Sequence, residues 1–222
     1  FVTQVSKRKR YWIRSMHGWP KLRDAIPNDG HHALKTLEEN GKIELLITQN
    51  VDRLHQKANS QRVLDLHGRV DRAVCLECAA IRKREHIQDC LINDNSKFTI
   101  DSTEIRPDGD VDLETELDVL EFKIPECDQC GGILKPDVVF FGGSIPKNRY
   151  EQGRKAIKSS DALLVTGSSL NVYSGYSFCR FANDNGKPIA IVNQGPTRAD
   201  PMAELKLETA CEETLSAILS TR

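Results

Sequence analysis

The sequence lacks the features that mark membrane-spanning, nucleic-acid-binding and disulfide-stapled proteins. No apolar run approaches the roughly 20 residues that cross a bilayer. The 31 basic and 32 acidic side chains leave a formal net charge of -1, so the chain as a whole does not attract nucleic acid or anionic lipid. Although it has seven cysteines, a chain of 222 residues is too long for a small scaffold held by disulfides. We therefore expect neither a nucleic-acid partner nor a membrane partner.

The sequence also lacks an initiating methionine. It begins with Phe1, so any targeting segment would lie upstream of it. The short basic run at residues 7–10 is interpreted as a solvated helix face or tail. Neither feature identifies a compartment.

What the sequence does contain is an alternation of helices and apolar strands. A helix is expected between a cap at Asn28 or Asp29 and a stop at Gly41. The apolar strands are typical of a parallel sheet that is covered on both faces. This pattern predicts an α/β fold with a doubly wound parallel sheet. The strands are expected at residues 43–48, 63–66, 162–165 and 188–193, and further helices at residues 174–185 and around 215–219.

A different region interrupts this pattern. Residues 69–137 contain two cysteine pairs and an acidic stretch at 108–121, which has no clear periodicity and is interpreted as a solvated loop. The sequence therefore predicts a small domain at 69–137, inserted into a larger one formed by 1–68 and 138–222.

The two cysteine pairs predict a metal site. Each Cys-x-x-Cys pair, Cys75 with Cys78 and Cys127 with Cys130, places two thiolates on one tight turn. Two such turns supply the four sulfur ligands that zinc prefers, and a site with four protein ligands is closed and structural. Paired redox thiols are the alternative, but two glycines after the second pair favour a zinc knuckle.

Polar residues follow the predicted strands at the edge where doubly wound sheets bind ligands. After the strand at 43–48, amide and carboxylate side chains are suited to ribose hydroxyls and a carboxamide, although an isolated Asn-x-Asp is as often a helix cap. The turns after the later strands offer backbone amides for phosphate or ribose. The residues are Gln49, Asn50 and Asp52 in the first turn, Gly167, Ser168 and Ser169 in the second, and Asn193, Gln194 and Gly195 in the third.

His67 ends another apolar strand, just before the first cysteine pair. An imidazole near its ordinary pKa is suited to taking a proton from a sugar hydroxyl, although a lone histidine is more often structural. The run at residues 138–142 is a candidate strand edge for an extended peptide, with plain core as the alternative.

Taken together and in order, these motifs resemble the sirtuin family. The match covers nearly the whole chain except about residues 86–106, and its details are most similar to the class II mitochondrial branch, the sirtuin-four type. The motifs that carry it are Thr48-Gln49-Asn50-Val51-Asp52, Leu66-His67-Gly68, the paired cysteines, Lys135-Pro136-Asp137-Val138-Val139-Phe140-Phe141-Gly142, Gly167-Ser168-Ser169-Leu170, and a late Asn193 and Cys211.

The resemblance implies an NAD-dependent protein lysine deacylase with a Rossmann-like large domain, a small zinc-ribbon domain, and a mitochondrial matrix location. NAD and Zn²⁺ are the implied cofactors, acyl-lysine proteins or peptides are the implied partners, and His67 is the implied base. Val51 and Cys211 would join the strand-end residues in binding NAD. Val139, Phe140 and Gly142 would pair with the peptide backbone. A tyrosine and an arginine three residues apart, Tyr11 and Arg14, resemble a pair that binds acidic acyl groups, with a solvated Arg14 as the alternative.

The departures from the family pattern lie mainly at the amino end. Nothing in residues 1–30 resembles the family's opening strand and Gly-Ala-Gly phosphate loop, so the sequence predicts a sheet that is incomplete at that end and a chain that alone binds NAD weakly. Gly143 stands where the family usually has an acidic residue. Two alternatives stay open, namely an NAD-dependent ADP-ribosyltransferase and a zinc-ribbon interaction fragment without catalysis.

Overall fold

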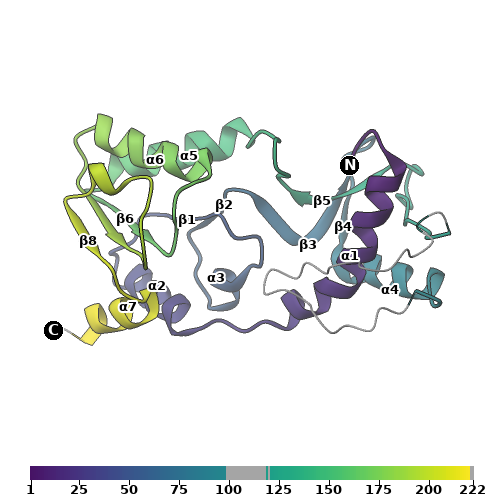
Figure 1. Cartoon of the computed structure of the whole chain (residues 1–222), viewed down its shortest axis with the longest axis horizontal. Helices are drawn as coiled ribbons and strands as arrows, with labels where there is room; N and C mark the ends of the chain where they lie inside the picture. Colours follow the sequence, from purple (N-terminus) through teal and green to yellow (C-terminus); the bar gives the residue numbers. More distant parts are fainter. Residues whose placement is uncertain (99–118, 120, 221–222) are drawn as a thin grey trace. The chain divides into compact units, whose positions relative to one another are not determined.

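The computed structural model describes residues 1–98, 119 and 121–220 (Figure 1). Most of the acidic stretch, residues 108–118 and 120, lies outside the described residues. The chain divides into two compact units. We call Ile26–Gly68 with Val139–Arg222 the parallel-sheet unit, and Phe1–Ala25 with Arg69–Val138 the cysteine unit. The sequence-based assignment of residues 1–25 to the larger domain differs from this division.

The parallel-sheet unit contains two hydrogen-bonded sheets whose strand pairs are all parallel. In one, β1 (Leu46–Thr48) pairs with β2 (Val63–Asp65). In the other, β7 (Ile189–Val192) lies between β6 (Leu163–Thr166) and β8 (Leu205–Leu207). Parallel strands that alternate with helices confirm the predicted α/β class. The helices are α2 (Asp29–Glu39), α3 (Leu54–Lys57), α5 (Lys147–Ser159), α6 (Tyr173–Asp184), the 3-10 turn η1 (Asp200–Met202) and α7 (Cys211–Ser220).

The predicted cap of α2 is confirmed in atomic detail. The Asn28 side chain accepts a hydrogen bond from the backbone N–H of His31, whose ring in turn contacts the Asn28 backbone N–H, as in a capping box. Beyond the last helical turn, Gly41 has a φ of 70°, a left-handed conformation that glycine adopts without strain. Local sequence chemistry therefore determines both ends of this helix.

Two predicted strands are shorter than expected. The strand expected at 43–48 begins only at Leu46. The run at 138–142 is not a strand. Strand β5 (Leu134–Val138) ends at Val138, the first residue of that run, and the chain then turns. The Gly143 N–H donates to the Phe140 carbonyl at 2.8 Å, and Gly142 has a φ of 79°. This left-handed turn takes the backbone away from strand geometry, and sequence hydrophobicity alone does not reveal it.

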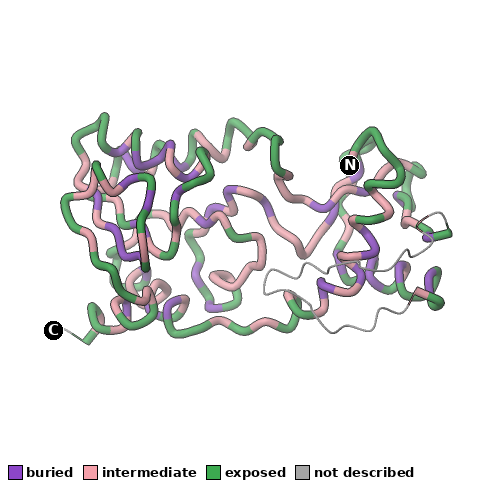
Figure 2. The backbone as a smooth tube through the Cα atoms, in the orientation of Figure 1, coloured by how far each residue is buried: buried purple, intermediate pink, exposed green. Residues whose placement is uncertain are grey.

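The core of the parallel-sheet unit lies between its strands and helices α5 and α6 (Figure 2). Leu66, Ile191 and Ala182 are fully buried, and Phe178 packs so closely on Gly153 that a Cβ there would lie 2.5 Å from the ring. This packing holds the carboxyl ends of β1, β2, β6 and β7 in place, where the candidate site residues lie.

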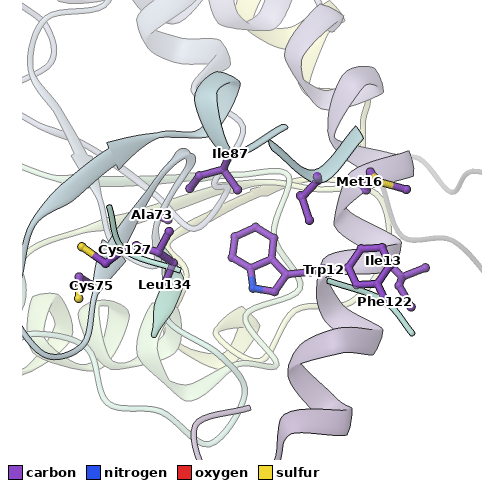
Figure 3. Packing of buried hydrophobic residues seen from close by; sticks show 10 residues of the cluster. Trp12, Ile13, Met16, Ala73, Cys75, Ile87, Phe122, Cys127 and Leu134 are labelled. Atoms are coloured by element: carbon purple, nitrogen blue, oxygen red, sulfur yellow. The ribbon is translucent and has the colours of Figure 1, made fainter. Parts of the chain in front are cut away.

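The cysteine unit contains α1 (Val5–Asp24), α4 (Arg84–Asp94) and a three-stranded sheet in the order β4-β3-β5. Strand β3 (Gly68–Cys75) pairs antiparallel with β4 (Ile81–Lys83). Figure 3 shows Trp12 projecting from α1 into a cluster that includes Ile87 of α4 and Leu134 of β5. Among the described residues, no helix has both the length and the apolar character needed to cross a membrane.

This packing explains why residues 1–25 belong to the cysteine unit. Helix α1 carries a buried stripe of Trp12, Met16 and Trp19. The guanidinium of Arg84 lies 5.4 Å from the Trp12 ring and 4.8 Å from the Trp19 ring, and donates to the Ser15 carbonyl. Burying two indole rings contributes several kcal/mol, on the order of 2–3 for each large apolar side chain. The sequence has no pattern that identifies which domain covers this stripe.

Candidate functional site

Four cysteine sulfurs meet in the cysteine unit. The sulfurs of Cys75 and Cys130 are 3.5 Å apart, those of Cys78 and Cys127 are 3.7 Å apart, and all four lie within 4.8 Å of one another. Four thiolates around zinc at about 2.3 Å would be separated by about 3.8 Å. The predicted ligand set is therefore assembled in a geometry that fits a tetrahedral zinc ion.

Two tight turns bring these sulfurs together. The Ala79 N–H donates to the Cys75 carbonyl, and the Gly131 N–H donates to the Cys127 carbonyl at 2.7 Å. Gly132 lies against the first turn, where a Cβ would be 2.9 Å from the Cys75 sulfur. Gly132, the second of the two glycines that follow Cys130, is thus required by close packing beside the sulfurs.

The thiols of this cluster cannot ionise independently. Backbone N–H groups of Gln129 and Cys130 lower the pKa of Cys127 to about 7. The contact with the Cys78 thiol raises the pKa of Cys130 to about 12. A divalent cation removes this conflict because it neutralises several thiolates at once. With four protein ligands and no open position, such a site is structural.

A second group of polar residues meets in the parallel-sheet unit, around His67. The imidazole follows β2 and has a partner on each nitrogen: Nδ1 lies 3.1 Å from the Gln49 carbonyl oxygen, and Nε2 lies 2.8 Å from Oγ of Ser174. The Gln49 side chain donates to Oγ of Ser168 at 3.0 Å. The ends of β1, β2 and β6 and the start of α6 are therefore joined in one hydrogen-bonded network.

This network also determines the protonation of His67. The carbonyl of Gln49 only accepts hydrogen bonds, so Nδ1 carries the proton and Nε2 keeps its lone pair. Partial burial lowers the pKa of His67, the Gln49 carbonyl opposes that shift, and the charge of Arg149 lowers the pKa further. The ring is therefore neutral near pH 7 and able to accept a proton at Nε2.

Sequence reasoning did not identify Ser174 or Gly175 as site residues. Ser174 is the second residue of α6, and Gly175 packs against Gln49 so closely that a Cβ would lie 2.8 Å from its side-chain amide. The only signal in the sequence is a Ser-Gly pair at the start of a predicted helix. Such pairs are too common to be interpreted without the tertiary contacts.

The rest of the turn after β1 has mainly local contacts. The Asn50 N–H donates to Oγ1 of Thr48, Val51 is half-buried, and Asp52 accepts from the Leu54 N–H at the start of α3. Asp52 lies one residue before the N-cap, Arg53, so this hydrogen bond forms a local turn that leads into α3. Beside it, burial and the neighbouring His31 lower the pKa of His55 to about 4.

The later strand ends surround a pocket of about 420 Å³. Gly167 has a φ of 60°, and its Cβ position faces the Cys211 sulfur, which donates to the Val192 carbonyl at 3.2 Å. Asn193 donates to the carbonyls of Gln194 and Gly195, and the Ser169 carbonyl accepts from the Arg198 N–H. The structure therefore brings predicted residues from β6, β7 and α7 together. The lining residues are Gly167, Asn193, Gln194, Thr209, Ala210, Cys211 and Glu212.

The predicted peptide-binding residues lie in the turn after β5. The Val139 N–H donates to the His67 carbonyl at 2.8 Å, so this turn is tied to the histidine. Phe140 and Gly142 flank Phe141, whose side chain is fully exposed. This turn therefore presents one large apolar side chain to solvent.

The predicted pair Tyr11 and Arg14 lies on α1, which is helical there as expected. The Tyr11 ring packs edge-on against Phe1 and Trp12, and burial raises its pKa to about 12. The half-buried phenol therefore packs against the core of the cysteine unit.

Comparison with known protein families gives one match. The profile described as the Sir2 family matches residues 1–174 of the chain.

Individual relatives agree with this match. The chain is 47% identical over 219 residues to NAD-dependent protein deacetylase 2 of Bradyrhizobium diazoefficiens, with 99% of the chain and 80% of the relative covered. It is 48% identical to an NAD-dependent protein deacetylase of Xanthomonas campestris pv. campestris, with 97% and 73% covered. The NAD-dependent protein lipoamidase sirtuin-4, mitochondrial, of Bos taurus is 45% identical, with 98% and 69% covered.

Solved structures are similar as well. A structure from a study of sirtuin substrate affinity has a TM-score of 0.78 and 29% identity, with 97% of this chain and 80% of that chain covered. A structure of Sir2 bound to an acetylated peptide has a TM-score of 0.72 and 30% identity, with 90% and 72% covered.

Proposed function

The chain belongs to the Sir2 family, and from that premise we propose that it is an NAD-dependent protein lysine deacylase. The observation that supports this most directly is the His67 network, in which a neutral imidazole has its basic nitrogen within 2.8 Å of a hydroxyl. The relatives named as NAD-dependent deacetylases share nearly half of its residues.

The strand-end residues fit the chemistry of NAD. When bound, NAD supplies the ribose that loses nicotinamide and receives the acyl group. The pocket beside Gly167, Asn193 and Cys211 would hold the adenosine half, because it offers backbone groups and amides for ribose hydroxyls and a small sulfur side chain for the base. Gln49, Asn50 and Asp52 would hold the nicotinamide half.

His67 would then act as a general base. Its lone pair at Nε2 takes the proton of the substrate hydroxyl that becomes acylated, and the Gln49 carbonyl stabilises the resulting charge at Nδ1. The turn at Val139, Phe140 and Gly142 would hold the peptide that carries the acyl-lysine. The zinc ion would have no chemical role, because its ligand set is closed.

The proposal is tested on the full product of the gene that encodes residues 1–222, called the gene product below. Incubated with an acyl-lysine peptide and NAD, it should release free lysine peptide, nicotinamide and O-acyl-ADP-ribose in equal amounts. Mass spectrometry distinguishes this outcome from ADP-ribosyl transfer, in which a protein gains the mass of ADP-ribose. The absence of both products would favour an interaction fragment without catalysis.

A mitochondrial location is proposed only by analogy. One of the relatives is a mitochondrial protein of Bos taurus, whereas the Bradyrhizobium and Xanthomonas relatives are bacterial. Fractionation of the source cells decides between these contexts.

The acyl group is a separate prediction, which rests on Tyr11 and Arg14. Arginine binds a carboxylate through two parallel hydrogen bonds, and a phenol can add a third. If the pair has this role, the gene product should favour glutaryl-lysine over acetyl-lysine peptides, and Arg14→Met should remove that preference without slowing acetyl removal.

The matched control is Arg10→Met, which removes an exposed arginine one helical turn earlier on α1. The ratio of the glutaryl and acetyl rates is the measurement. If the ratio is the same in Arg14→Met as in the wild type, Arg14 does not bind the acyl carboxylate, and the half-buried Tyr11 contributes only to packing.

A further inference from the structure

The hydroxyl of Ser174 is hydrogen-bonded to Nε2 of His67, the nitrogen that accepts a proton in the proposed mechanism. A neutral imidazole has one lone pair in its plane, and in His67 it belongs to Nε2 because Nδ1 donates to the Gln49 carbonyl. Oγ of Ser174 lies 2.8 Å from Nε2, so its proton points at that lone pair. A substrate hydroxyl therefore reaches Nε2 only through Ser174 or after displacing it.

The local structure favours passage through Ser174. Its hydroxyl has two lone pairs, and Nε2 is its hydrogen-bond partner within the described part of the chain. The residue is half-buried, at the start of α6. Its backbone is held in place because the Ser174 carbonyl accepts from Oγ of Ser177 at 2.7 Å. Displacing the hydroxyl would break this 2.8 Å hydrogen bond to Nε2 on a residue whose backbone is anchored.

We propose that Ser174 is a proton relay between the substrate hydroxyl and His67, an inference that rests on the function proposed above. The O–H bond of the substrate breaks and its proton binds Oγ of Ser174. The O–H bond of Ser174 breaks at the same time, and that proton binds Nε2. The substrate oxygen keeps its electron pair for the acyl carbon, serine is regenerated, and His67 becomes an imidazolium ion.

The charges around the ring oppose its protonation, so the imidazolium ion formed by the relay needs a stabilising partner. Arg149 of α5, whose guanidinium donates to the Leu66 carbonyl, is the cation that acts on His67, and the amino end of α6 adds partial positive charge. Asp65, two residues earlier on β2, is bound by Arg53 and Gln56. The carbonyl of Gln49 is therefore the partner that stabilises the charged ring.

The decisive variant is Ser174→Ala, compared with Ser174→Thr and the wild type. Single-turnover acyl transfer should slow by about tenfold or more in Ser174→Ala, with the KM for NAD little changed, and should recover in Ser174→Thr. The rate should depend on the deuterium fraction of the solvent along a curve in the wild type, because two protons move, and along a line in Ser174→Ala. Ser159→Ala, which removes an exposed hydroxyl from α5 outside the His67 network, is the control.

A second measurement does not depend on activity. In ¹⁵N NMR spectra of the gene product, Nε2 of His67 should be unprotonated at neutral pH. In Ser174→Ala the Nε2 signal should move toward that of a free, unprotonated imidazole nitrogen, because it no longer accepts a hydrogen bond from the Ser174 hydroxyl.

The outcomes separate the two proposals. A wild type that is inactive with NAD and acyl-lysine peptides contradicts the proposed function. A wild type that is active, with Ser174→Ala equally fast or faster, shows that the substrate displaces Ser174 and overturns the relay. A protonated Nε2 at neutral pH, or an Nε2 signal that is the same in Ser174→Ala as in the wild type, overturns the hydrogen bond on which the relay depends.

Discussion

Replacing His67 by tyrosine should lower acyl transfer by the gene product at least about 100-fold, because a positioned base contributes about 10²–10⁴ to the rate. A phenol has an ordinary pKa of about 10 and therefore takes no proton at pH 7. Thermal unfolding should change little, because His67 is only half-buried and its contacts are hydrogen bonds at the edge of the unit. The measurement is the initial rate of O-acyl-ADP-ribose formation.

The release of nicotinamide, which precedes proton transfer to His67, should persist in His67→Tyr. In the proposed scheme nicotinamide leaves before His67 acts, so His67→Tyr should still exchange labelled nicotinamide into NAD in the presence of the acyl peptide. His32→Tyr is the matched control, since His32 is exposed on α2 and lies outside the network. If His67→Tyr retains more than about a tenth of the wild-type turnover, another group is the base.

The second large effect concerns the metal site. Cys127→Ser should unfold the cysteine unit, because structural zinc contributes about 10–16 kcal/mol in small domains, whereas whole domains are stable by only about 5–15 kcal/mol. Both tryptophans of the chain, Trp12 and Trp19, lie in α1 of this unit and are buried. Tryptophan emission should therefore shift to longer wavelength in Cys127→Ser, and in the wild type after treatment with a strong zinc chelator.

A fully matched control is available in the same unit. Cys90 lies on α4, outside the four-sulfur cluster, so Cys90→Ser should keep one zinc per chain and the wild-type emission. Metal analysis of the reduced, folded wild type should give one zinc per chain. Folded wild-type protein that contains no zinc would show that the four thiols are held by packing alone.

Patterns that are local in the chain were sufficient for much of the fold. The cap at Asn28 and the stop at Gly41 depend on residues within one helical turn, and the apolar strand Ile189–Val192 was found within one residue at each end. The sequence also predicted the metal site, because a spacing of two residues between cysteines places both thiols of a pair on one turn. Their convergence to within 4.8 Å agrees with that prediction.

The position of α1 and the partners of His67 were decided only by tertiary structure. An apolar stripe such as Trp12, Met16 and Trp19 indicates that a helix face is buried, but it does not indicate which domain buries it. Ser174 is 107 residues from His67 in the chain, and a single 2.8 Å hydrogen bond joins them. The sequence determined which groups this protein can use, since backbone preference and ligand spacing act over a few residues. Contacts between distant residues follow from how the whole core packs, and that packing decided which hydroxyl lies against the basic nitrogen.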